Sequence, residues 1–222
     1  MRIWKVGAFM ALFLWTGCSE DKNLQHLESV NGFAVISQPA ANEKLATFAG
    51  GCFWATQEAM LELKGVHKVI SGYAGGTMEN PTYADVQTQN TGYAEAVQVY
   101  YDPSIISFET LCKAFFYAHD PTQIDRQGAD IGPEYRSIAF FRSPEEYRTI
   151  SQLIHQLEAH DFKGQTIATE ILPFQVIYPA ETEHQDYYPQ NLWDPYIRKV
   201  SMPKVMKLRD KMPEFIKAAY LK

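Results

Sequence analysis

The stretch LATFAGGCFWATQEAMLEL, residues 45–63, decides the fold of this chain. Its first five residues, Leu45 to Ala49, are apolar and predict a short buried strand, and the glycine pair that follows predicts a sharp turn. Residues 53–63 predict a helix with apolar side chains on one face, which Gly65 ends. A strand that turns directly into a helix places Cys52 at the helix N-terminus.

The remaining elements continue this alternation. Further strands are predicted where β-branched and aromatic residues gather, at 66–73, 94–101 and 137–141. Helices are predicted at 107–117 and 144–160, the second because Ser143 and Pro144 are typical of a helix start. A final strand region at 167–177 is interrupted by Pro173. The order predicts an α+β fold: a two-layer α/β sandwich of the ferredoxin-like, split-βαβ type with an irregular C-terminal extension.

Length and composition predict one domain. The chain has 222 residues, 46% of them hydrophobic, which is enough for a single substantial core. We place this domain at residues 44–200 and a C-terminal helical extension at 201–222, and we expect a monomer. The net charge of −6, without a cluster of Lys or Arg, argues against nucleic-acid binding. No spacing typical of metal ligands or of a phosphate-binding loop occurs.

The first residues predict export. Arg2 and Lys5 precede an apolar run at 6–15 that is too short to span a bilayer. The run ends in LWTGCS, which resembles the lipobox of bacterial lipoproteins, although Trp15 departs from its pattern. The resemblance implies a signal peptide at 1–17, lipidation of Cys18, and a lipid-anchored tether at 18–43 on the periplasmic face of a cell-envelope membrane. Ser19 is typical of outer-membrane sorting. A simply cleaved signal peptide is the alternative.

Cys52 is the candidate for thiol chemistry. A helix N-terminus carries roughly half a positive charge, which favours the thiolate, and the two glycines before the cysteine allow a substrate to approach. The alternative is a small buried cysteine without reactivity. Phe53 and Trp54 can wall a small apolar cavity beside the thiol, or they can belong to the ordinary core.

Two loops that lead into strands offer polar partners. The blocks NPTY, ending at Tyr83, and TGYAE, ending at Glu95, flank the first loop, so a phenol and a carboxyl can meet near the thiol. Burial against aromatic rings would raise the pKa of Glu95 and make it a proton donor, whereas an exposed strand position would leave it a plain carboxylate. The loop at 127–137 supplies a second phenol, Tyr135, and another carboxylate.

Taken together, these blocks resemble the peptide methionine sulfoxide reductases of the A type. The matching blocks cover about residues 44–191: GCFW at 51–54, NPTY at 80–83, TG and AE within 91–95, HDPT at 119–122, RQG at 126–128 with Asp130 and Gly132, YRS at 135–137, and AE, HQ and Tyr187 within 180–187. Ala55 and Tyr93 depart from the pattern, where relatives commonly have Gly and His. Neither position supplies a proposed catalytic group.

The resemblance implies the role of each residue. The Cys52 thiolate attacks the sulfur of a methionine S-sulfoxide, free or in proteins, while Glu95 protonates the oxygen. Tyr83 and Tyr135 hydrogen-bond that oxygen, and Asp130 belongs to the polar network that steers the substrate. Phe53 and Trp54 hold the methyl group. The implied activity is protein repair under oxidative stress.

Recycling requires a thiol, because the attack leaves Cys52 as a sulfenic acid. Many relatives carry resolving cysteines in a C-terminal tail, whereas this chain has only Cys18, Cys52 and Cys112. Cys112 lies on the apolar stripe of a predicted helix, which favours inert core over an unusual resolver. We therefore expect no bound cofactor and an external reductant, either a thioredoxin-like protein or a small thiol.

Two other functions stay open at this point. A cysteine acyl-transfer enzyme needs a base near the thiol, and the histidines at 119, 155, 160 and 184 are candidates for it. A redox sensor would oxidise Cys52 without turnover. Turnover of methionine sulfoxide with dithiothreitol separates a reductase from both.

Overall fold

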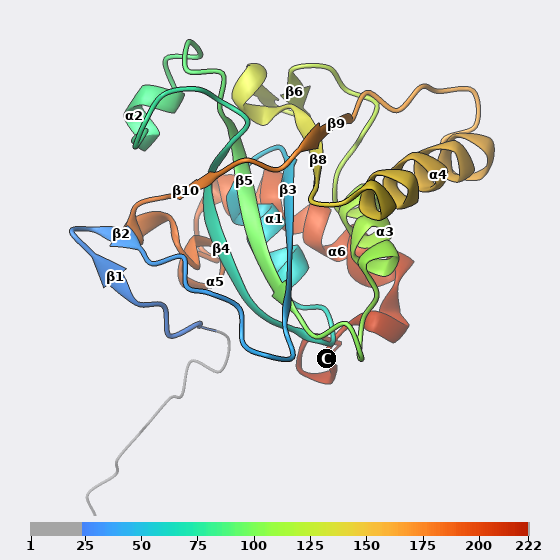
Figure 1. Cartoon of the computed structure of the whole chain (residues 1–222), viewed down its shortest axis with the longest axis horizontal. Coiled ribbons are helices and arrows are strands. Elements are labelled where there is room, and N and C mark those ends of the chain that lie inside the picture. Colours follow the sequence, from blue (N-terminus) through green and yellow to red (C-terminus); the bar gives the residue numbers. More distant parts are fainter. Residues whose placement is uncertain (1–23, 222) are drawn as a thin grey trace, which may run out of the picture.

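The computed structural model describes residues 24–221, and a six-stranded sheet forms its centre (Figure 1). In chain order the strands are β3 Lys44–Gly50, β4 Val66–Ala74, β5 Ala94–Tyr101, β8 Ser137–Phe141, β9 Glu170–Pro173 and β10 Ile177–Pro179. In space their order is β10-β4-β5-β3-β8-β9. All neighbours are antiparallel except β8 and β9, which are parallel.

This strand order contains the predicted topology. Because β5 lies between β3 and β4 and is antiparallel to both, β3 and β4 run parallel to each other. The helix that joins β3 to β4 therefore makes a split βαβ unit, and β8 pairs with the other side of β3. The prediction of an α+β sandwich of split-βαβ type is confirmed.

The helices are α1 Phe53–Leu61, α2 Tyr83–Val86, α3 Phe108–Ala118, α4 Pro144–His160, α5 Tyr187–Gln190 and α6 Met202–Lys211, with a π-helical segment, η3, at Ile197–Ser201. Short 3₁₀ helices lie at Pro133–Tyr135, Thr182–His184, Pro213–Phe215 and Ala218–Tyr220. Two small ladders pair β1 Ser29–Val30 with β2 Phe33–Ala34, and β6 Arg126–Gln127 with β7 Asp130–Ile131.

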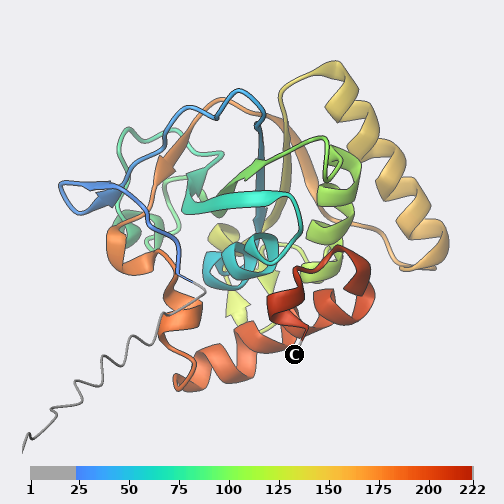
Figure 2. The same cartoon turned by 90° about the horizontal axis from the view of Figure 1, so that it is seen from below.

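Helices cover one face of the sheet. α1 and α3 pack directly on it, α6 lies outside them, and α4 lies at the β9 edge (Figure 2). Local signals set the helix starts: the side chain of Ser107 accepts a hydrogen bond from Thr110 N at 3.0 Å, and that of Ser143 accepts one from Glu146 N at 3.2 Å. The predicted helices at 107–117 and 144–160 are confirmed within a residue, whereas α1 ends two residues before the predicted end.

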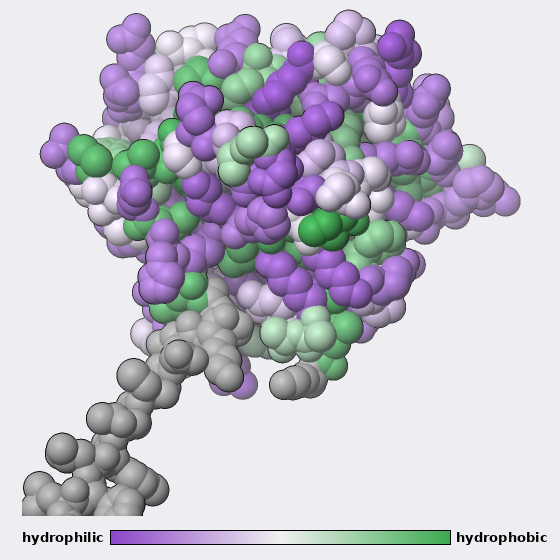
Figure 3. Space-filling model, turned by 60° about the horizontal axis from the view of Figure 1, so that its bottom comes forward, coloured by the Kyte–Doolittle hydropathy of each residue, from purple (hydrophilic) through white to green (hydrophobic). Residues whose placement is uncertain are grey.

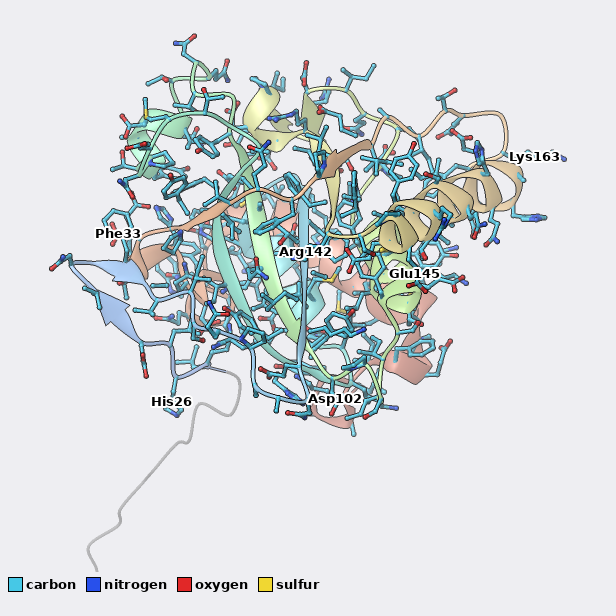
Figure 4. The ribbon with its side chains drawn as sticks, viewed as in Figure 1. His26, Phe33, Asp102, Arg142, Glu145 and Lys163 are labelled. Atoms are coloured by element: carbon cyan, nitrogen blue, oxygen red, sulfur yellow. The ribbon has the colours of Figure 1, made fainter. Side chains whose placement is uncertain are left out.

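The other face of the sheet is covered without helices. The guanidinium of Arg142 reaches across it, donates to Thr47 Oγ1 at 2.7 Å and lies over the ring of Phe174, 3.9 Å from the ring centre (Figure 4). Ile36, from the N-terminal segment, also packs on this face. The end of β3 at Gly50 leads directly into α1, on the helical side of the sheet.

The predicted strand region at 167–177, interrupted by Pro173, is present as two strands. Residues 170–173 form β9, which pairs with β8, and Ile177 begins β10, which pairs with β4 at the opposite edge. The segment between them crosses the sheet from one edge to the other (Figure 1). Pro173 ends one strand, and only tertiary pairing determines where the next strand lies.

The N-terminal segment packs on the domain from residue 24 onward. The Gln25 side chain donates to Asp186 Oδ1 at 2.7 Å and to Val69 O at 2.9 Å, and Ala34 N donates to Ala180 O at 3.3 Å. Residues 24–43 are thus part of the fold rather than a free tether, because side-chain and backbone hydrogen bonds dock a stretch that is polar in composition. The predicted signal peptide at 1–17 and Cys18 lie outside the described residues.

The C-terminal extension is likewise integrated. Lys217 N donates to Glu62 O at 2.8 Å, and Lys64 N donates to Phe215 O at 2.8 Å, so the end of the chain is hydrogen-bonded to the end of α1. Across residues 24–221, no helix has both the length and the apolar character that crossing a bilayer requires. Polar side chains dominate the face shown in Figure 3 and separate its apolar groups, as expected for a water-exposed surface.

Candidate active site

Cys52 lies in the turn between β3 and α1. It is the N-cap residue of α1, and 5% of its surface is exposed. Gly51 makes the turn at φ +83°, and a Cβ there would lie 2.5 Å from Gln127 Cγ. Both the left-handed backbone and the close packing therefore require glycine before the cysteine.

The first amides of α1 serve two groups. Phe53 N donates to Glu95 Oε2 at 2.9 Å, while the Trp54 amide acts to lower the pKa of the Cys52 thiol. Glu95 extends from the second residue of β5, next to β3 in the sheet. A thiol and a carboxyl from neighbouring strands thus share one helix N-terminus.

Glu95 is a buried carboxyl with an exposed fraction of 2%. Burial raises its pKa to about 8, and the negative charges of Asp130 and Glu134 act in the same direction, against the stabilising amide of Phe53. The group therefore carries its proton at neutral pH. This is the protonation state that donation to a substrate requires.

The prediction that the helix N-terminus lowers the pKa of Cys52 is wrong, because the pKa of this thiol is raised. Burial raises the pKa of the thiol, the charge of Glu95 adds to that effect, and hydrogen bonds from Tyr196 and the Trp54 amide oppose it. The helix charge is outweighed because it acts on a site from which water is largely excluded. Part of the positive charge of the helix N-terminus also acts on Glu95, through the Phe53 amide.

Both predicted phenols lie at this site. Tyr83 begins α2, and Tyr135 ends a 3₁₀ helix; burial followed by the charge of Glu95 raises the pKa of each hydroxyl, so both remain donors. The amide of Gln87 lies between the groups, with Nε2 at 3.3 Å from Glu95 Oε1 and at 3.4 Å from the Tyr135 hydroxyl. Glu181 fixes the start of α2 by accepting from Tyr83 N at 2.8 Å.

Aromatic rings enclose the thiol. The ring of Phe53 is buried, 6.4 Å from that of Tyr83 and 5.5 Å from that of His184, measured between ring centres. The half-buried ring of Trp54 stacks on Tyr187 at 3.9 Å. The apolar wall predicted for Phe53 and Trp54 is therefore present around the site, and Tyr187 and His184 complete it.

Asp130, at the start of β7, faces the C-terminal part of the chain. It accepts a hydrogen bond from the Tyr196 hydroxyl at 2.8 Å, and Lys204 Nζ lies 3.5 Å from its Oδ2. Tyr196 and Lys204 were not predicted from sequence, and neither were Gln87 and Glu134. No pattern in the sequence marks them, because they reach the site only through tertiary contacts.

The histidines do not supply a base for the thiol. His119 is buried between Phe115 O at 2.7 Å and Ser137 Oγ at 2.8 Å, and burial lowers its pKa to about 4. The ring of His184 packs on Tyr83 at 4.4 Å without a hydrogen bond to Cys52. The other two histidines named above lie on α4, at the β9 edge. An acyl-transfer enzyme that relies on a cysteine and a histidine is therefore not supported.

Cys112 is fully buried on α3, unpaired, and burial raises the pKa of its thiol well above the usual value. Its surroundings are those of an inert core cysteine. Within residues 24–221, no group of three or more metal-ligating side chains is arranged to hold an ion.

Comparison with known proteins identifies one family. A family described as peptide methionine sulfoxide reductase matches residues 44–215. The peptide methionine sulfoxide reductase MsrA of Deinococcus radiodurans is 48% identical over 173 residues, 78% of this chain and 84% of that protein. The MsrA of Saccharolobus solfataricus is 42% identical over 174 residues, 78% of this chain and 97% of that protein.

Solved structures agree. Mxr1 from Saccharomyces cerevisiae in its reduced form superimposes with a TM-score of 0.67 at 32% identity, covering 72% of this chain and 92% of the other. Methionine sulfoxide reductase A of Corynebacterium diphtheriae superimposes with a TM-score of 0.64 at 30% identity, covering 79% and 91%. Both structures are at least 30% identical to this chain, so the likeness is one of sequence as well as of fold.

Proposed function

The chain belongs to the peptide methionine sulfoxide reductase family and reduces methionine sulfoxide to methionine, and from this premise we propose that Cys52 is its nucleophile and Glu95 its proton donor. One observation carries the proposal. The two groups are both buried and share the N-terminus of α1, so a sulfoxide that contacts the thiol also meets the carboxyl.

The reaction transfers one oxygen between two sulfur atoms. The Cys52 thiolate attacks the sulfoxide sulfur and forms a transient S–S bond. The S–O bond of the substrate and this S–S bond then break, and the protonated oxygen ends on Cys52 as a sulfenic acid. Two electrons pass from the Cys52 sulfur to the substrate sulfur, which leaves as the thioether of methionine. The oxygen gains its proton from Glu95, whose raised pKa of about 8 keeps that proton available at neutral pH.

The same proton couples the two groups. The Glu95 charge raises the pKa of Cys52, so a thiolate beside a carboxylate is disfavoured, while a thiolate beside a neutral carboxyl is favoured. Protonation of the sulfoxide oxygen by Glu95 leaves a carboxylate, which can then accept the proton of the next Cys52 thiol. Glu95 thereby moves one proton per turnover from thiol to oxygen.

The pocket orients the substrate. Tyr83 and Tyr135 retain their protons and donate to the sulfoxide oxygen, and the rings of Phe53 and Trp54 contact the methyl group. A donor set on one side and an apolar wall on the other distinguish the two epimers, and we assign the S epimer as the substrate. Asp130 acts in this pocket through Tyr196, to which it is hydrogen-bonded.

Recycling proceeds through an external thiol. A first thiol condenses with the Cys52 sulfenic acid, which releases water and forms a mixed disulfide, and a second thiol then releases Cys52 as a thiol and becomes part of a free disulfide. The burial of Cys112 supports this route over an internal one. A thioredoxin-like dithiol supplies both thiols in one molecule; a small thiol supplies them in two.

The test is a reductase assay on both sulfoxide epimers with dithiothreitol. We expect wild type to turn over the S epimer many times and Cys52→Ser to have no activity. Cys112→Ser is the matched control, and it retains multiple turnover. Oxidation of Cys52 without turnover would indicate a redox sensor instead, and a Cys112→Ser variant limited to one turnover would make Cys112 the resolving thiol.

We also propose export and a lipid anchor on Cys18, with the domain monomeric at the periplasmic face of a cell-envelope membrane. The support is the apolar run at 6–15 followed by a lipobox-like cysteine. Cys18→Ala should release the protein from membranes into the soluble fraction while its specific activity is unchanged. Membrane association that survives this substitution contradicts the anchor.

A further inference from the structure

Lys204 on α6 brings a cation into the pocket. Its side chain is 12% exposed, and Nζ lies 3.5 Å from Asp130 Oδ2, whose side chain is 8% exposed. A Cβ at Gly51 would lie 3.4 Å from the same Nζ, so the ammonium lies against the turn that precedes Cys52. This ion pair is enclosed by protein on a helix that packs against α1 and α3.

Between this ion pair and the thiol lies Tyr196. Its hydroxyl donates to Asp130 Oδ1 at 2.8 Å, and its ring meets that of Trp54 edge-on, 5.8 Å between ring centres. A phenol has one proton to donate. In this structure the carboxylate of Asp130 accepts it.

We propose that Lys204 is a positioning residue of the reductase: its ammonium, held by Asp130 against the turn before Cys52, compensates the charge of that carboxylate and stabilises the Cys52 thiolate that attacks the sulfoxide. The inference rests on the proposed role of Cys52 as nucleophile. Lys204 forms no bond to substrate. It acts through its charge.

The charges around the thiol explain why a cation is needed. The titratable groups that face Cys52 come from several elements, and they are Glu95, Asp130, Glu134, Tyr83, Tyr135, Tyr187, Tyr196, His184 and Lys204. Within the described part of the chain, Lys204 is the cation of this set, and three of the others are carboxyls. Without Lys204, a thiolate would form beside an uncompensated Asp130.

Helix α6, Met202–Lys211, contributes a charge and contains no cysteine. It thus supports the nucleophile electrostatically, through Lys204, and not through a thiol of its own.

The experiment measures Cys52 directly in the full chain. Iodoacetamide alkylation of Cys52 is followed by peptide mass spectrometry across pH, in wild type, Lys204→Met, Lys204→Arg and the exposed control Lys199→Met. We expect Lys204→Met to raise the pH midpoint by about one unit, which slows alkylation about tenfold below that midpoint. Lys204→Arg keeps the charge and restores the profile, and Lys199→Met matches wild type. In turnover, Lys204→Met lowers kcat and leaves KM unchanged.

A wild-type alkylation profile in Lys204→Met overturns the proposal. Adding Asp130→Asn to Lys204→Met should return the midpoint toward wild type, because the uncompensated carboxylate is gone. Should Lys204→Met fail to fold by circular dichroism, Asp130→Asn alone decides: it must alkylate faster than wild type below the midpoint, and slower alkylation refutes the proposal. Because alkylation needs no sulfoxide, these outcomes are independent of whether Cys52 turns over substrate.

Discussion

Two buried carboxyl groups lie along α1, and they have different partners. Glu95 contacts the N-terminus of the helix, and Glu58 lies in its second turn. Burial raises the pKa of both, to about 8 in each case, and a neighbouring carboxylate adds to both shifts. The electrostatic cause is shared, so a raised pKa alone does not indicate which group is catalytic.

Their neighbours separate them. Glu58 lies beside Glu62, which is itself fully buried and paired twice with Arg209, at 2.5 and 2.7 Å. The groups around Glu58 are thus a carboxylate and a guanidinium that pair with each other. Glu95 instead lies beside a thiol and two phenols that a substrate can contact. A shifted carboxyl becomes a catalytic candidate when an adjacent group can use its proton.

The largest effect is expected for Glu95→Gln, because the amide has the shape of the carboxyl but no acidic proton to donate. Loss of a general acid should lower kcat by about 10²- to 10⁴-fold. In wild type, kcat/KM should fall as pH rises through about 8, because Glu95 then loses its proton. Gln does not titrate, so that decline should vanish from the residual activity of the variant.

Glu58→Gln is the matched control. It alters the other carboxyl of α1 whose pKa is raised, and it should leave kcat and the pH dependence of kcat unchanged. Steady-state kinetics across the pH range around the Glu95 pKa of about 8, on the S-sulfoxide of a blocked methionine, checks both variants. Equal kinetic losses in the two would mean that proximity to α1, rather than proximity to Cys52, sets the effect.

The second largest effect is expected on stability, at the structural cluster. Arg209→Met removes the partner of Glu62 and leaves a buried carboxylate unpaired, which should cost about 3–5 kcal/mol of unfolding free energy. Urea denaturation measures the loss, with Arg148→Met on the exposed face of α4 as control. The folded fraction should keep its kcat. A loss no larger than that of the control would show that the ion pair contributes nothing.

Local signals made most of the fold predictable. Ser107 and Ser143 act as caps in the structure as their positions in the sequence indicate, and β5 and β8 have the predicted bounds. The segment after Pro173 was not predictable, because its strand pairs with β4, about a hundred residues earlier in the chain. The docking of residues 24–43 likewise depends on distant partners.

In the site, too, residues within local sequence blocks were predictable, and residues brought in by long-range contacts were not. The blocks that contain Cys52, Tyr83, Glu95 and Tyr135 are local, and the structure brings these side chains together. Tyr196 and Lys204 were missed, since they meet Asp130 across 66 and 74 residues of chain. The direction of the Cys52 pKa shift was missed for a related reason: a helix N-terminus is visible in sequence, but the burial that outweighs it is a property of the assembled core.

The last prediction concerns how protein stability depends on pH through Glu58. The unfolded chain releases the Glu58 proton near the ordinary glutamate pKa of 4.5, whereas the folded chain holds it up to a pKa of about 8, so wild type loses stability as pH rises through this window. Glu58→Gln keeps the shape of the side chain and cannot titrate. It should match wild type at about pH 4 and be more stable than wild type at about pH 8.5, with a margin that grows as pH rises between the two pKa values, measured by urea denaturation. An identical pH slope in both proteins would mean that Glu58 is already ionised in the fold, and the resemblance between the two carboxyls would then be lost.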